Sequence, residues 1–407
     1  MSRPPLGDTL DVLGLSIPWY SLLIMAGVAV ALALAIREER RLRLPQDTML
    51  NLALVAIPLG IIGARLYYVV FEWGRFASNP WEIFYIWQGG LAIYGAVLGG
   101  LAAGAIVSRR MHVPLASLMD AVAPGLVLAQ AIGRWGNYAN MEAYGVRISN
   151  EAAQFFPLAV EIPVVTADGT TYWYWHMATF FYESMWCLIV FILLMACRRG
   201  MRRRGDVFAW YVLLYGAGRT VVEGLRTDSL TLVISGGEVR VSQVLSAVMT
   251  LAVAGLFFAR IVRSRRRIRL ADWIGWAQIA LALTCTFLGE FERNAYQMLF
   301  IPAQVVLGVM LVLDVVFLAH FVRRTGRLGA PGAWAVAAAA CCLLTLLLGL
   351  GRFGAANFAY VTLRQSVAML HVILSGAWFY LRAGRPGRRR RQPEQTAPAE
   401  AMQEEAS

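Results

Sequence analysis

Residues 20–36 read YSLLIMAGVAVALALAI, and residues 37–43, which follow directly, read REERRLR. A helix that crosses a membrane needs about 20 mainly apolar residues, and cytoplasmic ends of such helices are rich in basic residues. Ten further apolar stretches follow at 50–71, 91–108, 114–132, 178–197, 207–222, 242–262, 272–289, 299–321, 331–350 and 361–381. The sequence therefore predicts an all-α polytopic membrane protein with eleven spans.

The composition supports the same fold class. Of the 407 residues 58% are hydrophobic and 15% are charged, and the mean hydropathy is +0.57. Soluble domains have about 45–50% apolar and about 25% charged residues. This balance excludes a cytosolic enzyme, an intrinsically disordered chain and a secreted disulfide scaffold.

The net charge of +12 comes from basic residues that are all Arg. An excess of basic residues can indicate nucleic-acid binding, but here the Arg residues lie between apolar runs, so membrane topology explains them better and we expect no nucleic acid as a partner. The Cys residues lie in apolar stretches without paired spacing, which predicts neither a disulfide framework nor a metal site. These residues are Cys187, Cys197, Cys285, Cys341 and Cys342.

The Arg residues also predict the orientation. Every second connection between spans is rich in Arg, and these connections hold 26 of the Arg residues. They are 37–43, 109–110, 198–204, 260–269, 323–327 and 382–391. By the positive-inside rule we expect the N-terminus outside and the C-terminus inside.

A first polar cluster, GRWGNYANMEAYG at 133–145, follows the fourth predicted span and opens the longest outer loop, 133–177. Arg134 offers a planar set of donors suited to a phosphate, and Asn137 and Asn140 add neutral donors and acceptors. Glu142 could hold an Arg in place. The alternative is an interface loop with a snorkelling Arg, and the residues alone leave both open.

A second polar cluster lies near the outer end of the sixth predicted span. Tyr215, Arg219 and Glu223 are spaced by four residues and share one helix face, and Arg226 follows three residues later. A structural ion pair would explain them equally well. Both clusters end on the outer side, however, where two Arg residues could hold one lipid phosphate.

Three weaker features complete the candidate residues. Arg65 lies within the second span, and Tyr20 is a candidate interface anchor. Residues 89–100, GGLAIYGAVLGG, open the third span, and their small side chains favour close helix packing over a functional role.

Taken together, these segments resemble the bacterial prolipoprotein diacylglyceryl transferase family. The stretch at 133–145 is similar to that family's G-R-x-G-N-[FY]-x-N-x-E-x-x-G signature. Weaker support comes from GARLYYVVF at 63–71, GGLAIYGAVLGG at 89–100, YE at 182–183 and LYGAGRTVVEGLR at 214–226. The similarity covers about residues 15–262.

The resemblance implies an enzyme of the bacterial inner membrane that faces the periplasm. Such an enzyme moves the diacylglyceryl group of phosphatidylglycerol to the lipobox Cys thiol of a prolipoprotein signal peptide, forming a thioether and releasing glycerol phosphate. Its partners are therefore membrane lipids and prolipoproteins, and the resemblance implies no metal and no cofactor.

By the same resemblance, Arg134 and Arg219 would be catalytic and would hold the lipid phosphate. Tyr94 stands where the family usually has a His and would be the third catalytic residue. The substrate-binding residues would be Tyr20, Arg65, Asn137, Asn140, Glu142, Gly145, Tyr215, Glu223 and Arg226.

The resemblance also divides the chain. We expect a seven-span transferase-like core at 1–262, an extension of four further spans at 263–381, and a disordered cytoplasmic tail at 382–407. Because Tyr94 replaces the usual His, the alternative is a catalytically silent relative that binds anionic phospholipid or lipoproteins as a scaffold. A channel or transporter is a weaker alternative, since few acidic residues lie within the spans.

Overall fold

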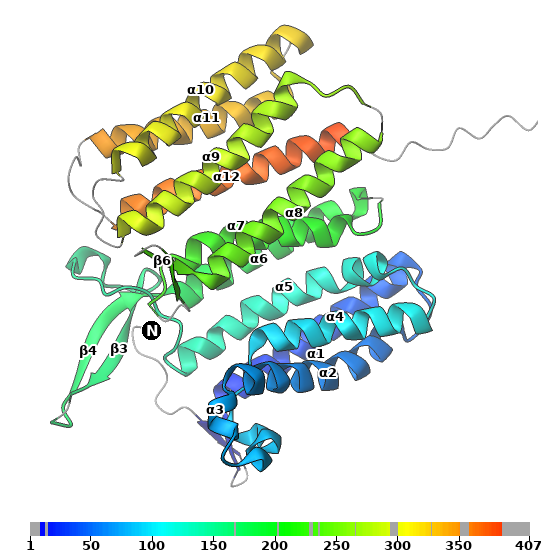
Figure 1. The fold of residues 1–407 in the computed structure, drawn as a ribbon, viewed down its shortest axis with the longest axis vertical. Helices are drawn as coiled ribbons and strands as arrows, with labels where there is room; N and C mark the ends of the chain where they lie inside the picture. The colour runs from blue at the N-terminus through cyan, green and yellow to red at the C-terminus, as the bar shows by residue number, and fades with distance from the viewer. Residues whose placement is uncertain are drawn as a thin grey trace, which may run out of the picture.

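The computed structural model contains eleven long helices that lie side by side (Figure 1). It describes residues 9–12, 15–166, 168–201, 203–227, 231–234, 237–264, 266–293, 300–326, 328–350 and 358–384. The long helices are α1 (Trp19–Leu42), α2 (Thr48–Phe71), α4 (Ile93–Arg110), α5 (Leu115–Ala139), α6 (Thr179–Cys197), α7 (Asp206–Glu223), α8 (Val241–Arg263), α9 (Leu270–Arg293), α10 (Phe300–Thr325), α11 (Gly329–Leu350) and α12 (Phe358–Ala383). Each of the eleven predicted spans coincides with one of them, and the all-α membrane class is confirmed.

Two of these helices are less apolar than the rest. Within the part of the chain that the structure describes, nine helices are long and apolar enough to cross a membrane by themselves, and α4 and α7 are not among them. Helix α4 has only 18 residues and ends in two Arg residues. Helix α7 carries Asp206, Arg219 and Glu223. Because α7 packs against α5, α6, α8 and α12, its polar side chains meet protein.

The helices form a stack in which α1, α2, α4 and α5 lie at one end, α6, α7 and α8 in the middle, and α9 to α12 at the other end (Figure 1). Helix α1 packs on α5 and α2 packs on α4, and α5 then leads through α6 and α7 to α8. Beyond α8, helices α9 and α12 form a pair, and α10 and α11 form the outermost pair. The tail predicted at 382–407 lies outside the described residues from 385 onward.

Glycines bring α2 and α4 into close contact. A Cβ at Gly63 would lie 2.4 Å from the Gly95 carbonyl oxygen, and a Cβ at Gly99 would lie 2.1 Å from that of Leu59. No side chain fits at these crossings, so small residues are required there. The packing interpretation of residues 89–100 is confirmed.

The outer loop begins later than the sequence predicted. We expected it to start at residue 133, but α5 continues to Ala139, so Arg134 and Asn137 lie on its last two turns. Glycine costs a helix about 1 kcal/mol relative to alanine. Packing offsets that cost at Gly136. A Cβ at this position would lie only 2.8 Å from the ring of Tyr20, so glycine lets the ring pack against the helix.

Short helices and strands form the remaining connections. The segment between α2 and α4 is α3 (Trp73–Phe76) and the 3₁₀ turns η1 (Pro80–Phe84) and η2 (Ile86–Gln88). Two further 3₁₀ turns are η3 (Glu151–Ala153) and η4 (Arg198–Gly200). Three antiparallel ribbons pair β1 (Thr9–Val12) with β2 (Leu15–Pro18), β3 (Ala159–Val165) with β4 (Thr171–Met177), and β5 (Thr231–Ile234) with β6 (Gly237–Arg240). The β3–β4 hairpin extends beyond the helix ends (Figure 1).

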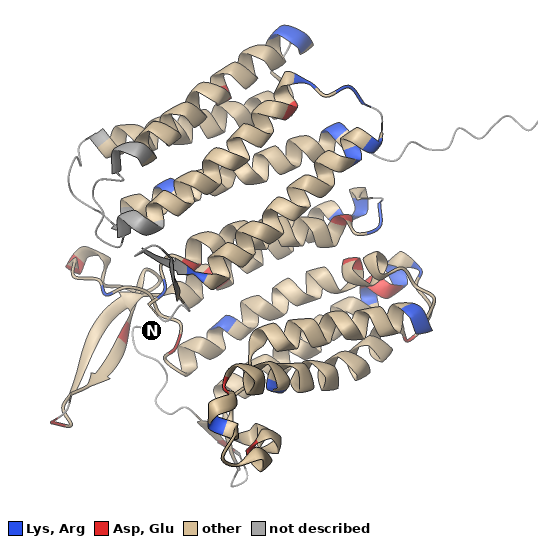
Figure 2. Cartoon of the chain, in the orientation of Figure 1, with Lys and Arg blue, Asp and Glu red and all other residues tan. Residues whose placement is uncertain are grey.

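Most Arg residues gather at the opposite end of the helices from this hairpin (Figure 2). Several of them pair there with buried carboxylates. Arg198 lies 2.8 Å from Glu38, and Arg382 lies 3.1 Å from Asp272. Arg residues of the basic connections therefore form ion pairs that hold neighbouring helix ends together.

The carboxylate of Asp206 at this end links α7 and α8 to α12, which is one of the last four helices. Asp206, in the first turn of α7, pairs with Arg260 on α8 at 2.6 Å and accepts a hydrogen bond from the Tyr380 hydroxyl on α12 at 2.9 Å. The Tyr380 ring also packs edge-on against Trp210 and Phe257. These contacts seat α12 on α7 and α8.

Candidate active site

Glu183 is the centre of the site. It is the only charged residue of α6 and it is buried, with 2% of its surface exposed. A charge within a membrane span costs several kcal/mol unless it is paired. Glu183 therefore needs cationic partners from neighbouring helices.

Two Arg residues supply them, one to each carboxylate oxygen. Arg134 on α5 lies 2.7 Å from Oε1, and Arg219 on α7 lies 2.7 Å from Oε2. The Arg134 and Arg219 side chains remain 20% and 13% exposed, whereas that of Glu183 is 3% exposed. The two Arg side chains are therefore more accessible than the carboxylate that they hold.

The second predicted cluster, on α7, contacts the same Glu183 carboxylate. The Tyr215 hydroxyl donates to Oε1 of Glu183 at 3.2 Å, and Arg219 also pairs with Glu223 at 2.5 Å. The charge of Arg226 adds a favourable interaction with Glu183. The expected shared face of Tyr215, Arg219 and Glu223 is thus present, and it points at α6.

Side-chain hydrogen bonds fix α5, α6 and α7 relative to one another beside this cluster. Trp135 on α5 donates to the Ser184 hydroxyl at 3.2 Å, and that hydroxyl donates to the Ala131 carbonyl at 2.8 Å. Trp186 on α6 donates to the Leu214 carbonyl at 2.9 Å. These contacts flank Glu183 in the chain and hold α6 against α5 and α7, the two helices that carry the Arg residues.

The opposite end of α7 is also anchored to α5. Asp120 accepts hydrogen bonds from the backbone N–H groups of Gly205 and Phe208 at 2.6 and 2.9 Å, at the start of α7. A carboxylate at a helix N-terminus satisfies donors that have no partner within the helix. Helix α7 is therefore held at both ends, which restrains Arg219.

The polar residues of the signature stretch follow Arg134. Asn137 accepts a hydrogen bond from Arg134 at 3.3 Å, which orients the guanidinium. Asn140 ends α5, with its N–H bonded to the Gly136 carbonyl at 3.0 Å. Glu142 is exposed, and its backbone N–H donates to the Asn137 carbonyl at 2.9 Å.

Gly145 joins this stretch to the end of α7. Its N–H donates to the Met177 carbonyl at 2.9 Å, and it forms a β-bridge with Arg226. A Cβ there would lie 2.8 Å from the side chains of Met177 and Thr179 and 2.9 Å from the Leu225 carbonyl oxygen. Glycine is therefore required to bring the loop against Arg226.

Arg65 has a different environment from the other predicted residues. Its guanidinium donates to the backbone carbonyls of Ile83 at 2.8 Å, Gly89 at 2.7 Å and Gly90 at 3.0 Å. It also donates to the Glu82 carbonyl at 2.5 Å. Arg65 thus anchors the segment that leads into α4.

Tyr20 and Tyr94 lie on the other helices around the site. Tyr20 is the second residue of α1, its ring lies against Gly136, and it is 37% exposed. The Tyr94 hydroxyl, at the start of α4, lies 3.3 Å from that of Ser242 on α8. The structure therefore brings together Arg134, Arg219, Tyr215 and Glu223 around Glu183. The other three predicted residues have different partners: Tyr20 contacts Gly136, Tyr94 contacts Ser242, and Arg65 binds backbone carbonyls.

An apolar cleft opens between α6, α7 and α12. Its volume is about 410 Å³, and it contains Tyr182 and Gly218, the chain neighbours of Glu183 and Arg219. The remaining lining residues are Trp186, Ala217, Val221, Val222, Ser366, Val367, Met369, Leu370 and Ile373. A hydrocarbon chain fits this lining.

Glu183 is absent from the residues that the sequence analysis proposed for the site. It was noted only as part of the YE pair at 182–183. The signal that could have found it is its position: it is the single acidic or basic residue between 178 and 197. An intramembrane carboxylate of this kind indicates a functional site by default.

The chain matches one protein family over most of its helical core. Residues 9–259 match the family model described as prolipoprotein diacylglyceryl transferase. A phosphatidylglycerol–prolipoprotein diacylglyceryl transferase of Listeria monocytogenes serotype 4a (strain HCC23) is 40% identical over 266 residues, which are 64% of this chain and 92% of the relative. The protein of the same name from Bacillus cereus (strain G9842) is 42% identical over 255 residues, 62% of this chain and 90% of the relative.

Proposed function

This chain belongs to the prolipoprotein diacylglyceryl transferase family, and on that premise we propose that it transfers the diacylglyceryl group of phosphatidylglycerol to a prolipoprotein. The acceptor is the thiol of the lipobox Cys in the signal peptide. The observation that carries the proposal is the pair of Arg134 and Arg219, held on the two oxygens of the buried Glu183 carboxylate.

The reaction needs positive charge where a phosphate leaves. The thiol sulfur forms a bond to a glycerol carbon, the bond from that carbon to the phosphate oxygen breaks, and the thiol proton is lost. The products are a thioether and glycerol phosphate. Hydrogen-bond donors aimed at the developing charge are a large source of rate enhancement in such sites.

Arg134 and Arg219 provide these donors. Each guanidinium has five N–H groups, and the contacts with Glu183, Asn137 and Glu223 use only part of them. With Arg226, the cluster has three cations against the two carboxylates Glu183 and Glu223. The resulting single positive charge matches the single negative charge of a phosphodiester.

The other predicted residues have supporting roles in this proposal. Glu183 positions both Arg residues, and Tyr215 and Glu223 orient the same groups from α7. Asn137, Asn140, Glu142 and Gly145 shape the stretch beside Arg134. Tyr20 forms the rim on α1, and Arg65 holds the segment that precedes Tyr94.

We propose that Tyr94 contacts the substrate from the α4 side. Its hydroxyl can both donate and accept hydrogen bonds, and its neighbour Ser242 lies in the first turn of α8. Tyr94→Phe removes only this hydroxyl, so it tests the role directly.

The apolar cleft supports the choice of a diacyl lipid. It has mainly apolar side chains and lies beside the helices that carry Glu183 and Arg219. We propose that acyl chains occupy it while the phosphate meets the two Arg residues. Because Ser366 and Met369 on α12 line one wall, the extension would then contribute to lipid binding.

We also propose the division of the chain and its orientation. The family match ends at residue 259, close to the boundary of 262 that separates the core from the extension at 263–381. The chain is a multi-pass membrane protein, and its Arg-rich helix ends lie opposite the β3–β4 hairpin (Figure 2). The positive-inside rule then favours an inner-membrane protein with its site toward the periplasm.

Complementation tests the function. The chain is expressed in a bacterium depleted of its own diacylglyceryl transferase, beside Arg134→Ala and the control Arg147→Ala. Arg147 lies in the outer loop, where its guanidinium carbon lies 3.7 Å from the centre of the Tyr174 ring. We expect growth with the wild type and with Arg147→Ala, and none with Arg134→Ala.

A second assay separates catalysis from binding. Membranes with the expressed chain are incubated with phosphatidylglycerol and a lipobox peptide, and the thioether product is measured by mass spectrometry. A folded wild-type protein that binds the lipid but forms no thioether would contradict the transferase proposal and support a scaffold.

A further inference from the structure

The last four helices contain a second buried polar cluster, formed by one residue from each of three helices. These residues are Asp314 on α10, Cys342 on α11 and His371 on α12, with 6%, 0% and 2% of their surfaces exposed. Each lies near the middle of its helix. Ionisable groups at such a depth are costly, so the cluster requires a physical reason.

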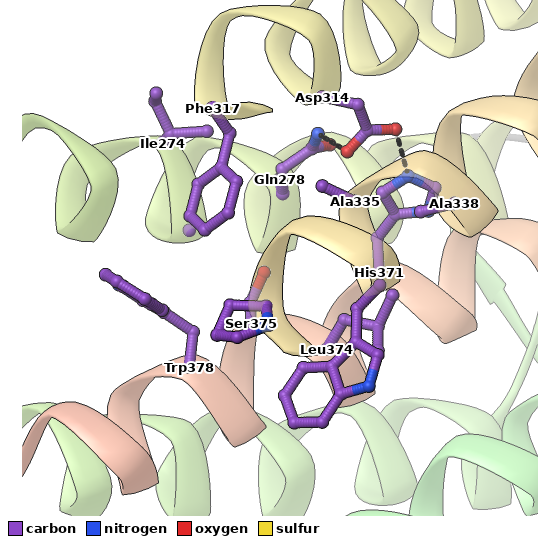
Figure 3. Close-up of a pocket in the computed structure, with 13 residues that line it drawn as sticks. Ile274, Gln278, Asp314, Phe317, Ala335, Ala338, His371, Leu374, Ser375 and Trp378 are labelled. Atoms are coloured by element: carbon purple, nitrogen blue, oxygen red, sulfur yellow. Dashed lines mark hydrogen bonds and ion pairs between the residues drawn. The ribbon is translucent and has the colours of Figure 1, made fainter. Parts of the chain in front are cut away.

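Three ligand atoms converge in this cluster. Nε2 of His371 lies 2.9 Å from Oδ2 of Asp314 and 3.6 Å from Sγ of Cys342, and all three atoms lie within 4.8 Å of one another (Figure 3 shows the Asp314–His371 contact). Imidazole nitrogen, thiolate sulfur and carboxylate oxygen are the ligands that zinc and related metal ions prefer.

The second nitrogen of His371 determines which atom faces the cluster. Nδ1 lies 2.8 Å from the Val367 carbonyl oxygen, which can only accept a hydrogen bond, so Nδ1 carries a hydrogen. The 2.9 Å contact between Nε2 and Oδ2 of Asp314 shares one further proton, and loss of that proton leaves a lone pair of Nε2 directed at the cluster. Metal-binding His residues commonly donate their other N–H to a backbone carbonyl in this way.

Gln278 on α9 orients the carboxylate. Its Nε2 donates to Oδ1 of Asp314 at 3.0 Å and to the Met310 carbonyl at 2.9 Å, which leaves Oδ2 directed at His371 (Figure 3). Gln278 is 4% exposed, and its Oε1 has no hydrogen-bond partner among the described residues. A buried amide oxygen without a partner requires an explanation, and a hydrogen-bond donor in the adjoining cavity, such as a water, would supply one.

The cluster borders a cavity of about 50 Å³. Its polar lining residues are Gln278, Asp314, His371 and Ser375, and Phe317, Trp334 and Trp378 are among its apolar ones. One water needs roughly 10–15 Å³ of such space. The cavity thus has room for a water, which would approach an ion from the side of Asp314 and His371, because Cys342 is not among the lining residues.

We propose that Asp314, Cys342 and His371 bind one divalent transition-metal ion, with Zn²⁺ as the probe. Ligand bonds of about 2.0 Å to nitrogen and 2.3 Å to sulfur at a tetrahedral angle separate N from S by about 3.5 Å. The observed separation is 3.6 Å. The same geometry places N and O about 3.4 Å apart, so binding widens the 2.9 Å contact by about 0.5 Å.

Charge favours the same ion. An ionised Asp314 and a Cys342 thiolate neutralise a divalent cation, so the loaded site has no net charge inside the membrane. Binding requires loss of the thiol proton and of any proton between His371 and Asp314. This inference does not rest on the transferase activity, because the cluster lies beyond residue 259, where the family match ends.

Metal titration of the full-length chain in detergent tests the site. The purified protein is stripped with a chelator and titrated with Zn²⁺, and with Co²⁺ to record thiolate-to-metal absorption. Cys342→Ser and His371→Ala remove ligands, and Cys341→Ser is the matched control because Cys341 is adjacent but outside the cluster. Size-exclusion profiles establish that each variant is folded.

We expect about one Zn²⁺ per chain and a thiolate–Co²⁺ band in the wild type and in Cys341→Ser. We expect at least about a 100-fold weaker affinity and no such band in Cys342→Ser. A wild type that binds neither ion stoichiometrically would overturn the proposal, as would equal affinity in folded Cys342→Ser. Either result would leave a proton-bound Asp314–His371 pair.

Discussion

The guanidinium of Arg219 on α7 lies 2.7 Å from the carboxylate of Glu183 on α6. The other oxygen of that carboxylate holds Arg134 on α5. One buried acid therefore sets the separation of two cations that are 85 residues apart in the chain. Variants of this acid report on the site more directly than variants of either Arg.

Glu183→Gln should disable the site. Without the negative charge, Arg134 loses its carboxylate partner and Arg219 keeps only Glu223, so the two guanidinium groups are no longer held on one acid and their positions relax. We expect kcat/KM to fall by about 100-fold, equivalent to about 2.7 kcal/mol of transition-state stabilisation. The rate is measured with phosphatidylglycerol and a lipobox peptide.

Glu151→Gln is the control for this change, because Glu151 is exposed in the outer loop. Glu183→Asp keeps the charge and should recover part of the rate. An unchanged rate in Glu183→Gln would show that the carboxylate does not position the Arg residues.

Gly145→Ala should destabilise the outer loop. The new methyl group would lie within 2.9 Å of Met177, Thr179 and the Leu225 carbonyl, which a packed structure relieves only by shifting. We expect a loss of about 1–3 kcal/mol in unfolding free energy, measured by thermal denaturation in detergent. The matched variant Gly100→Ala has open space around the new atom and should not lower stability.

Arg65→Gln should loosen the segment between α2 and α4. The guanidinium donates to backbone carbonyls of Ile83, Gly89 and Gly90, and glutamine cannot reach all of them. Hydrogen bonds to a charged group contribute about 1.5–3 kcal/mol each, so we expect a net loss of at least about 2 kcal/mol.

Limited proteolysis within residues 72–90 measures this change. Arg75→Gln is the control, because Arg75 is an exposed neighbour of the same segment. Equal protection of the segment in Arg65→Gln and the wild type would contradict the anchoring role.

Asp206→Asn should weaken the attachment of the extension. The change removes the counter-ion of Arg260 and weakens the acceptor for Tyr380. Breaking a buried pair costs about 3–5 kcal/mol, and Tyr380→Phe, which removes one hydrogen bond, should cost about 1 kcal/mol. Thermal denaturation measures both, with exposed Asp47→Asn as the control; equal losses in Asp206→Asn and Asp47→Asn would argue against the junction.

Ser366→Trp should narrow the cleft between α6, α7 and α12. A larger side chain there would compete with acyl chains, so we expect KM for phosphatidylglycerol to rise several-fold with little change in kcat. Leu363→Trp is the matched control, because Leu363 is exposed on the same helix and does not line the cleft. Equal KM values in the two variants would place the acyl chains elsewhere.

The local pattern of the sequence determined much of this protein. Apolar runs of about 20 residues predict their helices because a backbone in lipid must satisfy its own hydrogen bonds. The Arg-rich connections predict the orientation, and the stretch 133–145 indicates the family. Small residues at 89–100 predict the close crossing of α2 and α4, since packing there depends on side-chain size alone.

Only the tertiary structure decided which polar groups meet. Glu183 lies between Arg134 and Arg219 because three helices converge on it, and no spacing along the chain encodes that convergence. Arg65 resembles a binding residue in sequence, yet backbone carbonyls occupy its guanidinium. Cys342 and His371 are 29 residues apart in separate spans and meet at 3.6 Å because α11 and α12 pack together. Burial makes each of these contacts important for stability. An unpaired charge in the membrane interior costs several kcal/mol, and only helix packing brings its partner close enough to offset that cost.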